Sequence, residues 1–214
     1  MPCQWHGSSW GLGSCFVKRR AFLYPTNYWF TFRGCVFGTC SHAKSGFKGA
    51  FMEGKLRNMT AIYLFKGENV LLLYRQGGKV VNNVWTGSAG GHFENDELND
   101  AKSCVLRELH EELGLSPEDI ENLSLRYVTL RRTKGEIRQN YYFFAALKDS
   151  VNDHLVSNEG ICKWFSLEDI RSLDMPFTAK YVMEHFCSSG RHTDQLYAGI
   201  ANADQVSFLD LPEC

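Results

Sequence analysis

The pattern of hydrophobic and polar residues predicts several short strands and at least two helices. Residues 60–65 and 70–74 are mostly aliphatic, aromatic or β-branched, and the Lys-Gly-Glu-Asn segment between them is a turn signal, so we expect a β-hairpin. Residues 123–132 and 137–147 predict a second hairpin. The Tyr-Tyr-Phe-Phe-Ala-Ala run in its second strand is apolar on both faces, which indicates a central strand of a sheet.

The remaining signals are shorter. Strands and helices interleave without internal repeats, so the chain predicts one mixed α/β domain. The other elements that we expect are a short strand at Val84–Trp85, a strand at 161–165, a helix at 167–173 capped by Ser166, a helix that Pro176 opens and that runs through Phe186, and one or two edge strands within 191–211.

Residues 101–113 carry the strongest helix signal. They contain no Pro or Gly, and strong helix formers dominate. Asn99 or Asp100 can cap the N-terminus, and Gly114 stands where a left-handed C-terminal cap belongs. At about 100° per residue, one stripe of this helix is apolar and consists of Ala101, Val105, Leu109 and Leu113.

Three carboxylates gather beside that stripe. Glu108, Glu111 and Glu112 share a helix face, where like charges repel, and the last turn of a helix disfavours acids. An ordinary solvated acidic face is one interpretation. The other is that a cation holds the acids together, and carboxylate oxygens suit Mg²⁺, with Mn²⁺ as a second candidate. Arg107 is placed to pair with Glu111 one turn on and to orient it.

This stretch resembles the Nudix box, G-x5-E-x7-R-E-U-x-E-E-x-G-U, in which U is a bulky aliphatic residue. The chain is two residues longer than the pattern between Gly91 and Arg107, so either Glu97 or Glu94 is the first glutamate of the box. The resemblance covers roughly residues 56–200 and implies an α/β fold, a Nudix-type α/β/α sandwich around a mixed sheet. The matching residues are Arg107, Glu108, Leu109, Glu111, Glu112, Gly114 and Leu115.

The resemblance also implies roles for individual residues. Glu111 and Glu112 are expected to bind the metal with the carbonyl of Gly90, and Glu108 is expected to be a further ligand or the base that activates water. Arg107 is expected to orient a carboxylate. Glu159, on the loop before a predicted strand, is an additional candidate ligand, with a plain loop acid as the alternative.

Two further regions are candidates for binding substrate. Phe177 and Thr178 open the last predicted helix, where relatives of the MutT type line a base pocket. No Asn stands in the Met-Pro-Phe-Thr-Ala stretch, which weakens a specific assignment to oxidised guanine. Arg132 is a candidate for the phosphates, within a basic cluster for which a solvated turn is the alternative; the cluster comprises Arg131, Arg132, Lys134 and Arg138.

Together these features predict a Mg²⁺-dependent hydrolase of a nucleoside diphosphate-linked substrate. The leading substrate is a normal or oxidised nucleoside triphosphate, cleaved to the monophosphate and pyrophosphate. One alternative is a nucleotide-sugar or dinucleotide pyrophosphatase. Another is a non-catalytic Nudix-fold binding or regulatory module, although such modules usually lose box carboxylates and this chain keeps all three.

The amino-acid composition limits the classes of binding partner that we expect. The 214 residues are 44% hydrophobic and carry a net charge of −1, so the expected partner is a small-molecule nucleotide and not a nucleic acid. No run of about 18 apolar residues exists, and no membrane span is expected. The eight Cys lack paired CxxC spacing, which favours reduced thiols and a cytoplasmic location.

The composition changes abruptly near Met52. Residues 1–51 contain six Lys or Arg, twelve aromatics and no Asp or Glu, whereas the rest carries 17 basic and 24 acidic residues. The first segment shows no period that could bury its aromatic residues. We therefore expect residues 1–51 to be a leader or irregular extension, and residues 52–214 to be the Nudix-like domain, which should fold and act when translation starts at Met52.

Overall fold

A computed structural model describes residues 54–76 and 83–214. The expectations about residues 1–51 and about a start at Met52 lie outside these described residues and remain predictions. No helix in the described part of the chain is long and apolar enough to cross a membrane.

Eight strands of the described residues form one mixed sheet, in the order β3-β2-β1-β5-β4-β7-β8, with β6 paired to β2. The pairs β1–β5 and β4–β7 are parallel, and the others are antiparallel. The strands are β1 (Leu56–Lys66), β2 (Asn69–Arg75), β3 (Val84–Thr86), β4 (Ile120–Thr133), β5 (Glu136–Leu147), β6 (Gly160–Ser166), β7 (Tyr197–Ala201) and β8 (Val206–Asp210).

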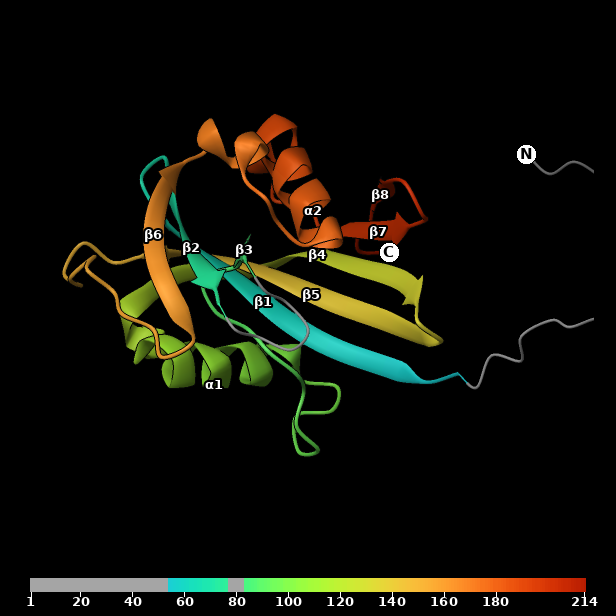
Figure 1. The fold of residues 1–214 in the computed structure, drawn as a ribbon, viewed down its shortest axis with the longest axis horizontal. Coiled ribbons are helices and arrows are strands. Elements are labelled where there is room, and N and C mark those ends of the chain that lie inside the picture. The colour runs from blue at the N-terminus through green and yellow to red at the C-terminus, as the bar shows by residue number, and fades with distance from the viewer. Residues whose placement is uncertain (1–53, 77–82) are drawn as a thin grey trace, which may run out of the picture. The chain divides into compact units, whose positions relative to one another are not determined.

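Two helices cover opposite faces of this sheet, α1 (Ala101–Leu113) and α2 (Phe177–Ser188) (Figure 1). The arrangement confirms the predicted α/β/α sandwich around a mixed sheet. Short 3₁₀ segments complete the chain: η1 (Pro117–Asp119), η2 (Asp169–Ser172) and η3 (Gly190–His192).

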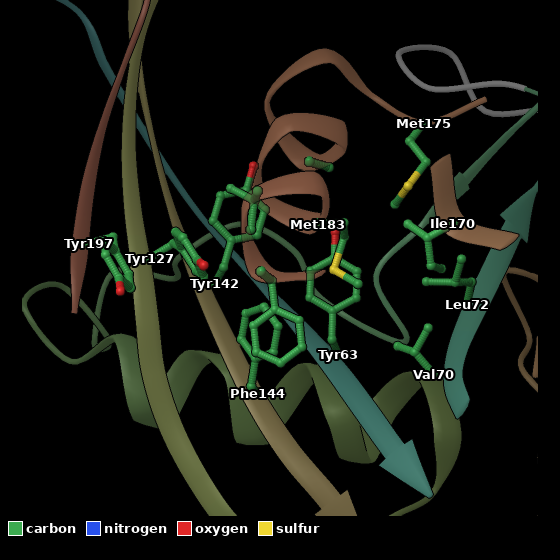
Figure 2. Close-up of a cluster of buried hydrophobic side chains, with 13 residues drawn as sticks. Tyr63, Val70, Leu72, Tyr127, Tyr142, Phe144, Ile170, Met175, Met183 and Tyr197 are labelled. Atoms are coloured by element: carbon green, nitrogen blue, oxygen red, sulfur yellow. The ribbon is translucent and has the colours of Figure 1, made fainter. Parts of the chain in front are cut away.

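Alternating side chains of the central strands build one core on each face. Ile62 of β1 and Phe143 of β5 pack against α1, whereas their neighbours Tyr63 and Phe144 pack against α2 (Figure 2). This follows from the two-residue period of a strand. Strand β5 lies between β1 and β4, so the prediction of a central strand is confirmed.

Most predicted elements are confirmed, and one changes type. Both hairpins, the helix at 101–113 and the helix opened by Pro176 are present, and the C-terminal segment forms two edge strands. The helix expected at 167–173 is the shorter 3₁₀ segment η2, which is preceded by Glu168 and not capped by Ser166. Ile170 is buried in the core under α2, so packing of this one residue fixes the segment without a full α-helix.

Candidate active site

Helix α1 is fixed at both ends by the residues that its sequence predicts. The Asp100 carboxylate accepts a hydrogen bond from the Ser103 backbone N–H at 3.0 Å, and Gly114 adopts a left-handed conformation with φ 68°. Val105 and Leu109 are fully buried against the sheet. The polar flank of the helix is thereby held beside the loop that precedes it.

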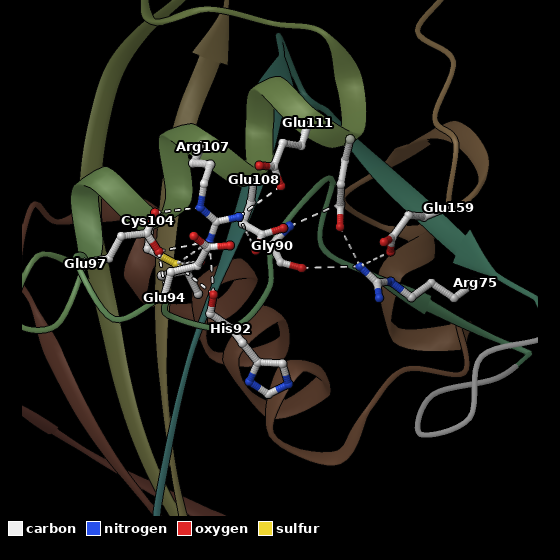
Figure 3. A network of polar contacts seen from close by, with 12 residues as sticks. Arg75, Gly90, His92, Glu94, Glu97, Cys104, Arg107, Glu108, Glu111 and Glu159 are labelled. Atoms are coloured by element: carbon white, nitrogen blue, oxygen red, sulfur yellow. Dashed lines mark hydrogen bonds and ion pairs between the residues drawn. The ribbon is translucent and has the colours of Figure 1, made fainter.

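Arg107 is the centre of the first polar network on this flank (Figure 3). Its Nε and Nη2 atoms donate to the two oxygens of Glu97 at 2.6 and 2.9 Å, a bidentate pair. Its Nη1 atom donates to Glu108 at 2.9 Å and to Glu111 at 3.0 Å, and Nη2 also donates to the His92 carbonyl at 3.0 Å. The predicted pairing of Arg107 with Glu111 is therefore present.

Glu97, and not Glu94, is the acid that Arg107 binds. Glu97 is 6% exposed, and the hydrogen bond from Arg107 lowers its pKa to about 2. Glu94 is exposed and contributes its backbone N–H, which donates to Glu97 at 3.0 Å. The two additional residues of the box lie in the turn before α1, where Asn99 takes a left-handed φ of 74°.

A second polar cluster gathers around Arg75, at the end of β2. A single atom, Nη2, lies 2.8 Å from Glu112 Oε1, 2.7 Å from Glu159 Oε2 and 3.3 Å from the Gly90 carbonyl oxygen. Strand register explains the meeting, because Arg75 pairs with Gly160 and so lies beside Glu159. Three of the predicted ligands thus converge on one cationic nitrogen.

The backbone of Gly90 is part of this cluster for a steric reason. Its φ is +146°, and a Cβ there would lie 2.3 Å from the Thr60 carbonyl oxygen, so the position requires glycine. This close approach lets the Gly90 N–H donate to Glu112 at 3.2 Å while its carbonyl faces Arg75. At Gly91 a Cβ would lie 2.2 Å from Glu108, so this glycine leaves room for the carboxylate.

Burial changes the acidity of two box carboxylates. It raises the pKa of Glu112 to about 8, against the lowering effect of Arg75, and the charges of Glu159 and Glu108 add to the increase. The pKa of Glu108 is also raised, first by burial and then by Glu111 and Glu159. Buried carboxylates of this kind are stabilised in their ionised form by a nearby cation.

The predicted ligands do not all converge. The described residues contain no group of three or more His, Cys, Asp or Glu side chains at ligand spacing. Glu111 is 54% exposed and is directed at Arg107. The oxygen atoms of Gly90, Glu112 and Glu159 nevertheless surround a positive charge, and oxygen-only surroundings suit Mg²⁺ or Mn²⁺. The donor set therefore fits a divalent ion, and Glu108, whose charge raises the pKa of Glu112, is a further candidate.

Arg75 is expected to compete with such an ion. In Arg75→Gln, the affinity for Mn²⁺ should rise by about tenfold or more, because the competing charge lies within hydrogen-bond distance of the same oxygens. Calorimetric titration of Mn²⁺ at about pH 9, where Glu112 is mostly ionised, measures this change. Arg132→Gln is a control with the same charge change. Equal or weaker Mn²⁺ binding by Arg75→Gln would exclude the competition.

A cavity of about 190 Å³ extends from this cluster along the sheet face under α2. Arg75 and Gly90 line one end, and Phe177 and Thr178 of α2 line another part, so the two predicted pocket residues do border a cavity. Asn140 of β5 also lines it, and its amide nitrogen lies 3.5 Å from Thr178 Oγ1.

Of the two neighbouring arginines of β4, Arg131 lines the cavity and the predicted Arg132 does not. Arg131 lines the cavity, with its guanidinium carbon 4.2 Å from the centre of the Phe177 ring. Arg132 is exposed and does not line it, because successive residues of β4 point to opposite faces of the sheet. Of the predicted basic cluster, Arg131 and Arg138 line the cavity, and phosphate binding by Arg132 stays a prediction.

Sequence reasoning missed Arg75 and Asn140. Both had a weak signal: Arg75 ends an apolar strand with a single cation, and Asn140 is a polar residue at the start of the apolar run in β5. Neither signal predicts a site residue, because the contacts of Arg75 and Asn140 depend on how the strands pair.

Comparisons with solved structures agree with the fold. The chain is similar in structure to the mutator MutT protein from Bacillus halodurans, with 23% identity, 74% of this chain and 99% of that chain covered, and a TM-score of 0.52. The MutT protein from Methanosarcina mazei Go1 gives 21% identity, coverage of 64% and 96%, and a TM-score of 0.52. These likenesses show the fold alone, and no curated protein matches the chain.

The match to a family model is more specific. A model described as the NUDIX domain matches residues 55–186, which include the whole box, Arg75, Glu159 and most of α2. The chain therefore belongs to the Nudix family and is a pyrophosphohydrolase of that family.

Proposed function

We propose that the protein is a Mg²⁺-dependent hydrolase of a normal or oxidised nucleoside triphosphate, which it cleaves to the monophosphate and pyrophosphate. The observation that carries this proposal is one continuous cavity, which is lined at one end by Arg75 and Gly90 and elsewhere by the Phe177 ring and the Asn140 amide. Arg75 in turn contacts the carboxylates of Glu112 and Glu159. A charged group and a planar base can therefore occupy the same cavity at once.

The residues around Gly90 suit the reacting end of the substrate. Gly90, Glu112 and Glu159 would hold the ion with Glu108 close by, and a bound Mg²⁺ would neutralise phosphate charge and acidify a bound water. Glu108 is half-buried with a raised pKa, which suits a group that accepts a proton from water. Arg107 holds Glu108 and Glu111 in place and is thus a positioning residue.

The residues under α2 suit the base. The Phe177 ring lies beneath the Arg131 guanidinium, and the Asn140 amide offers both donor and acceptor atoms. Tyr63 is fully buried, lines the cavity, and its hydroxyl has no hydrogen-bond partner among the described residues. A buried polar group without a partner is costly, so a polar atom of a ligand or a water fits beside it.

Phe177→Ala tests the base pocket. We expect KM for nucleotides to rise by about tenfold with a smaller change in kcat, because the ring contributes binding that is equal in the ground and transition states. Steady-state kinetics with a panel of nucleoside triphosphates measures both constants. An unchanged KM for every nucleotide in the panel would place the base elsewhere.

The same panel tests the alternatives. Hydrolysis of a nucleotide sugar or dinucleotide, with no hydrolysis of any triphosphate, would favour the corresponding pyrophosphatase. Binding of a nucleotide without hydrolysis in Mg²⁺ or Mn²⁺ would favour a non-catalytic module. The presence of all three box carboxylates and the burial of Glu108 and Glu112 support the catalytic interpretation.

A further inference from the structure

Three arginines form a row across the sheet face that lines the cavity. Arg57 of β1 is the register partner of Arg138 of β5, and Arg138 is the register partner of Arg131 of β4. All three line the cavity and are half-buried. Like charges directly opposite each other on neighbouring strands destabilise a sheet. A row of this kind therefore needs a compensating negative charge.

The described residues supply little compensation. Within residues 54–76 and 83–214, the only carboxylate within 4.0 Å of the three guanidinium groups is Glu136, which lies 3.6 Å from Arg138 Nε and 4.0 Å from Arg57 Nη1. Lys55 also binds Glu136, at 3.2 Å. Arg138 Nε is buried and has no hydrogen-bond partner in the described part of the chain. One acid thus pairs with three basic groups, and Arg131 has no carboxylate within 4.0 Å among the described residues.

The position of the row separates it from the carboxylate cluster. The loop before α1 lies against Thr60, whose N–H donates to the Gly91 carbonyl at 2.8 Å. Arg57 is three residues earlier on the same strand, so its backbone lies about 10 Å from that hydrogen bond. Its side chain contacts the far part of the same loop, where Arg57 Nε lies 3.2 Å from His92 Nε2. This separation corresponds to the far side of a nucleoside whose diphosphate lies at Gly90.

We propose that Arg57, Arg131 and Arg138 form an anion subsite for a phosphomonoester on the nucleoside part of the substrate. The inference rests on the proposed function, which places the nucleoside in the cavity. Guanidinium groups bind phosphate through paired charge-assisted hydrogen bonds, and Arg138 Nε is a donor without a partner. The substrate class is thereby narrowed to nucleotides phosphorylated on the ribose as well as at the 5′ position.

Isomeric nucleotides test the subsite without turnover. The full chain is titrated calorimetrically, without metal, with adenosine 5′-diphosphate, adenosine 2′,5′-bisphosphate and adenosine 3′,5′-bisphosphate, and with the guanosine series. These isomers carry the same number of phosphates in different places. We expect one ribose-phosphorylated isomer to bind at least about tenfold more tightly than the 5′-diphosphate, the effect of one charged hydrogen bond.

Matched variants assign the preference to the row. In Arg138→Gln the preference should fall to about twofold or less. Arg132→Gln should retain the preference, because Arg132 occupies the adjacent pairing position and its side chain lies on the opposite face of the sheet. Arg57→Gln repeats the test independently. Thermal unfolding without ligand should show no loss of stability in Arg138→Gln, since repulsion within the row is relieved.

The subsite would be overturned if both ribose-phosphorylated isomers bound no more tightly than the 5′-diphosphate, or if none of these nucleotides bound measurably. It would also be overturned if the preference for a ribose-phosphorylated isomer were unchanged in both Arg138→Gln and Arg57→Gln. Hydrolysis of the nucleoside triphosphates tests the proposed function independently of these titrations. Absence of hydrolysis with the binding preference retained would overturn the proposed function and leave the subsite. Hydrolysis without the binding preference would overturn the subsite alone.

Discussion

Glu112→Gln is expected to lower kcat by about 10²-fold or more while the fold is kept. Glu112 is 6% exposed and lies between Arg75 and the Gly90 N–H, and glutamine has nearly the same shape. The substitution removes one negative charge from the oxygens that would hold the ion. Steady-state kinetics in Mg²⁺ gives the loss, and exposed Glu121→Gln is the control that should retain activity.

The same substitution should not weaken the metal-free protein. Burial raises the pKa of Glu112 from 4.5 to about 8, so the folded state binds this proton more tightly than the unfolded state does. The free energy of unfolding that Glu112 contributes to the wild type therefore decreases as pH rises from about 4.5 to about 8. In Glu112→Gln this pH-dependent decrease should be absent. Thermal unfolding in a chelator checks this expectation. Full activity in Glu112→Gln would exclude Glu112 as a ligand.

Arg107→Leu is expected to lower the free energy of unfolding by about 3 kcal/mol or more, because it leaves the buried Glu97 carboxylate without its partner. It should also lower kcat, since Glu108 and Glu111 lose the group that orients them. Urea denaturation measures the first effect. Glu94→Gln is the control, and its free energy of unfolding should stay within about 0.5 kcal/mol of wild type.

The pH dependence of this effect has a definite sign. The pKa of Glu97 in the folded protein is about 2, below the ordinary 4.5, so its stabilising contribution is present above the ordinary value and is lost as pH falls toward 2. The difference between wild type and Arg107→Leu should therefore shrink between about pH 5 and about pH 3. A constant difference over that range, or a large effect of Glu94→Gln, would contradict the assignment of Glu97.

Local signals in the sequence were sufficient to predict much of the fold. The limits of α1 follow from Asp100 and Gly114, which act on residues three or four positions away. The carboxylates of the box follow in the same way, because a helix fixes which of its own residues share a face. The pairing of Arg107 with Glu111 was predictable for that reason.

Contacts between strands could not be predicted from these signals. Arg75 reaches Glu159 only because β2 and β6 pair with Arg75 opposite Gly160. The side of β4 on which Arg131 lies depends on two register shifts, near Glu121 and near Leu125, each of which exchanges the faces of the residues that follow. An alternating pattern alone therefore could not decide between Arg131 and Arg132.

The most direct test of the proposed function is a product analysis with the full chain. A panel of nucleoside triphosphates, including ribose-phosphorylated and oxidised forms, is incubated with Mg²⁺, with Mn²⁺ or with a chelator, and the products are separated by chromatography. We predict that a triphosphate yields the monophosphate and pyrophosphate, that the chelator stops the reaction, and that Glu112→Gln is at least about 10²-fold slower. Failure to cleave any nucleotide with either metal, or equal rates with the chelator present, would contradict the account.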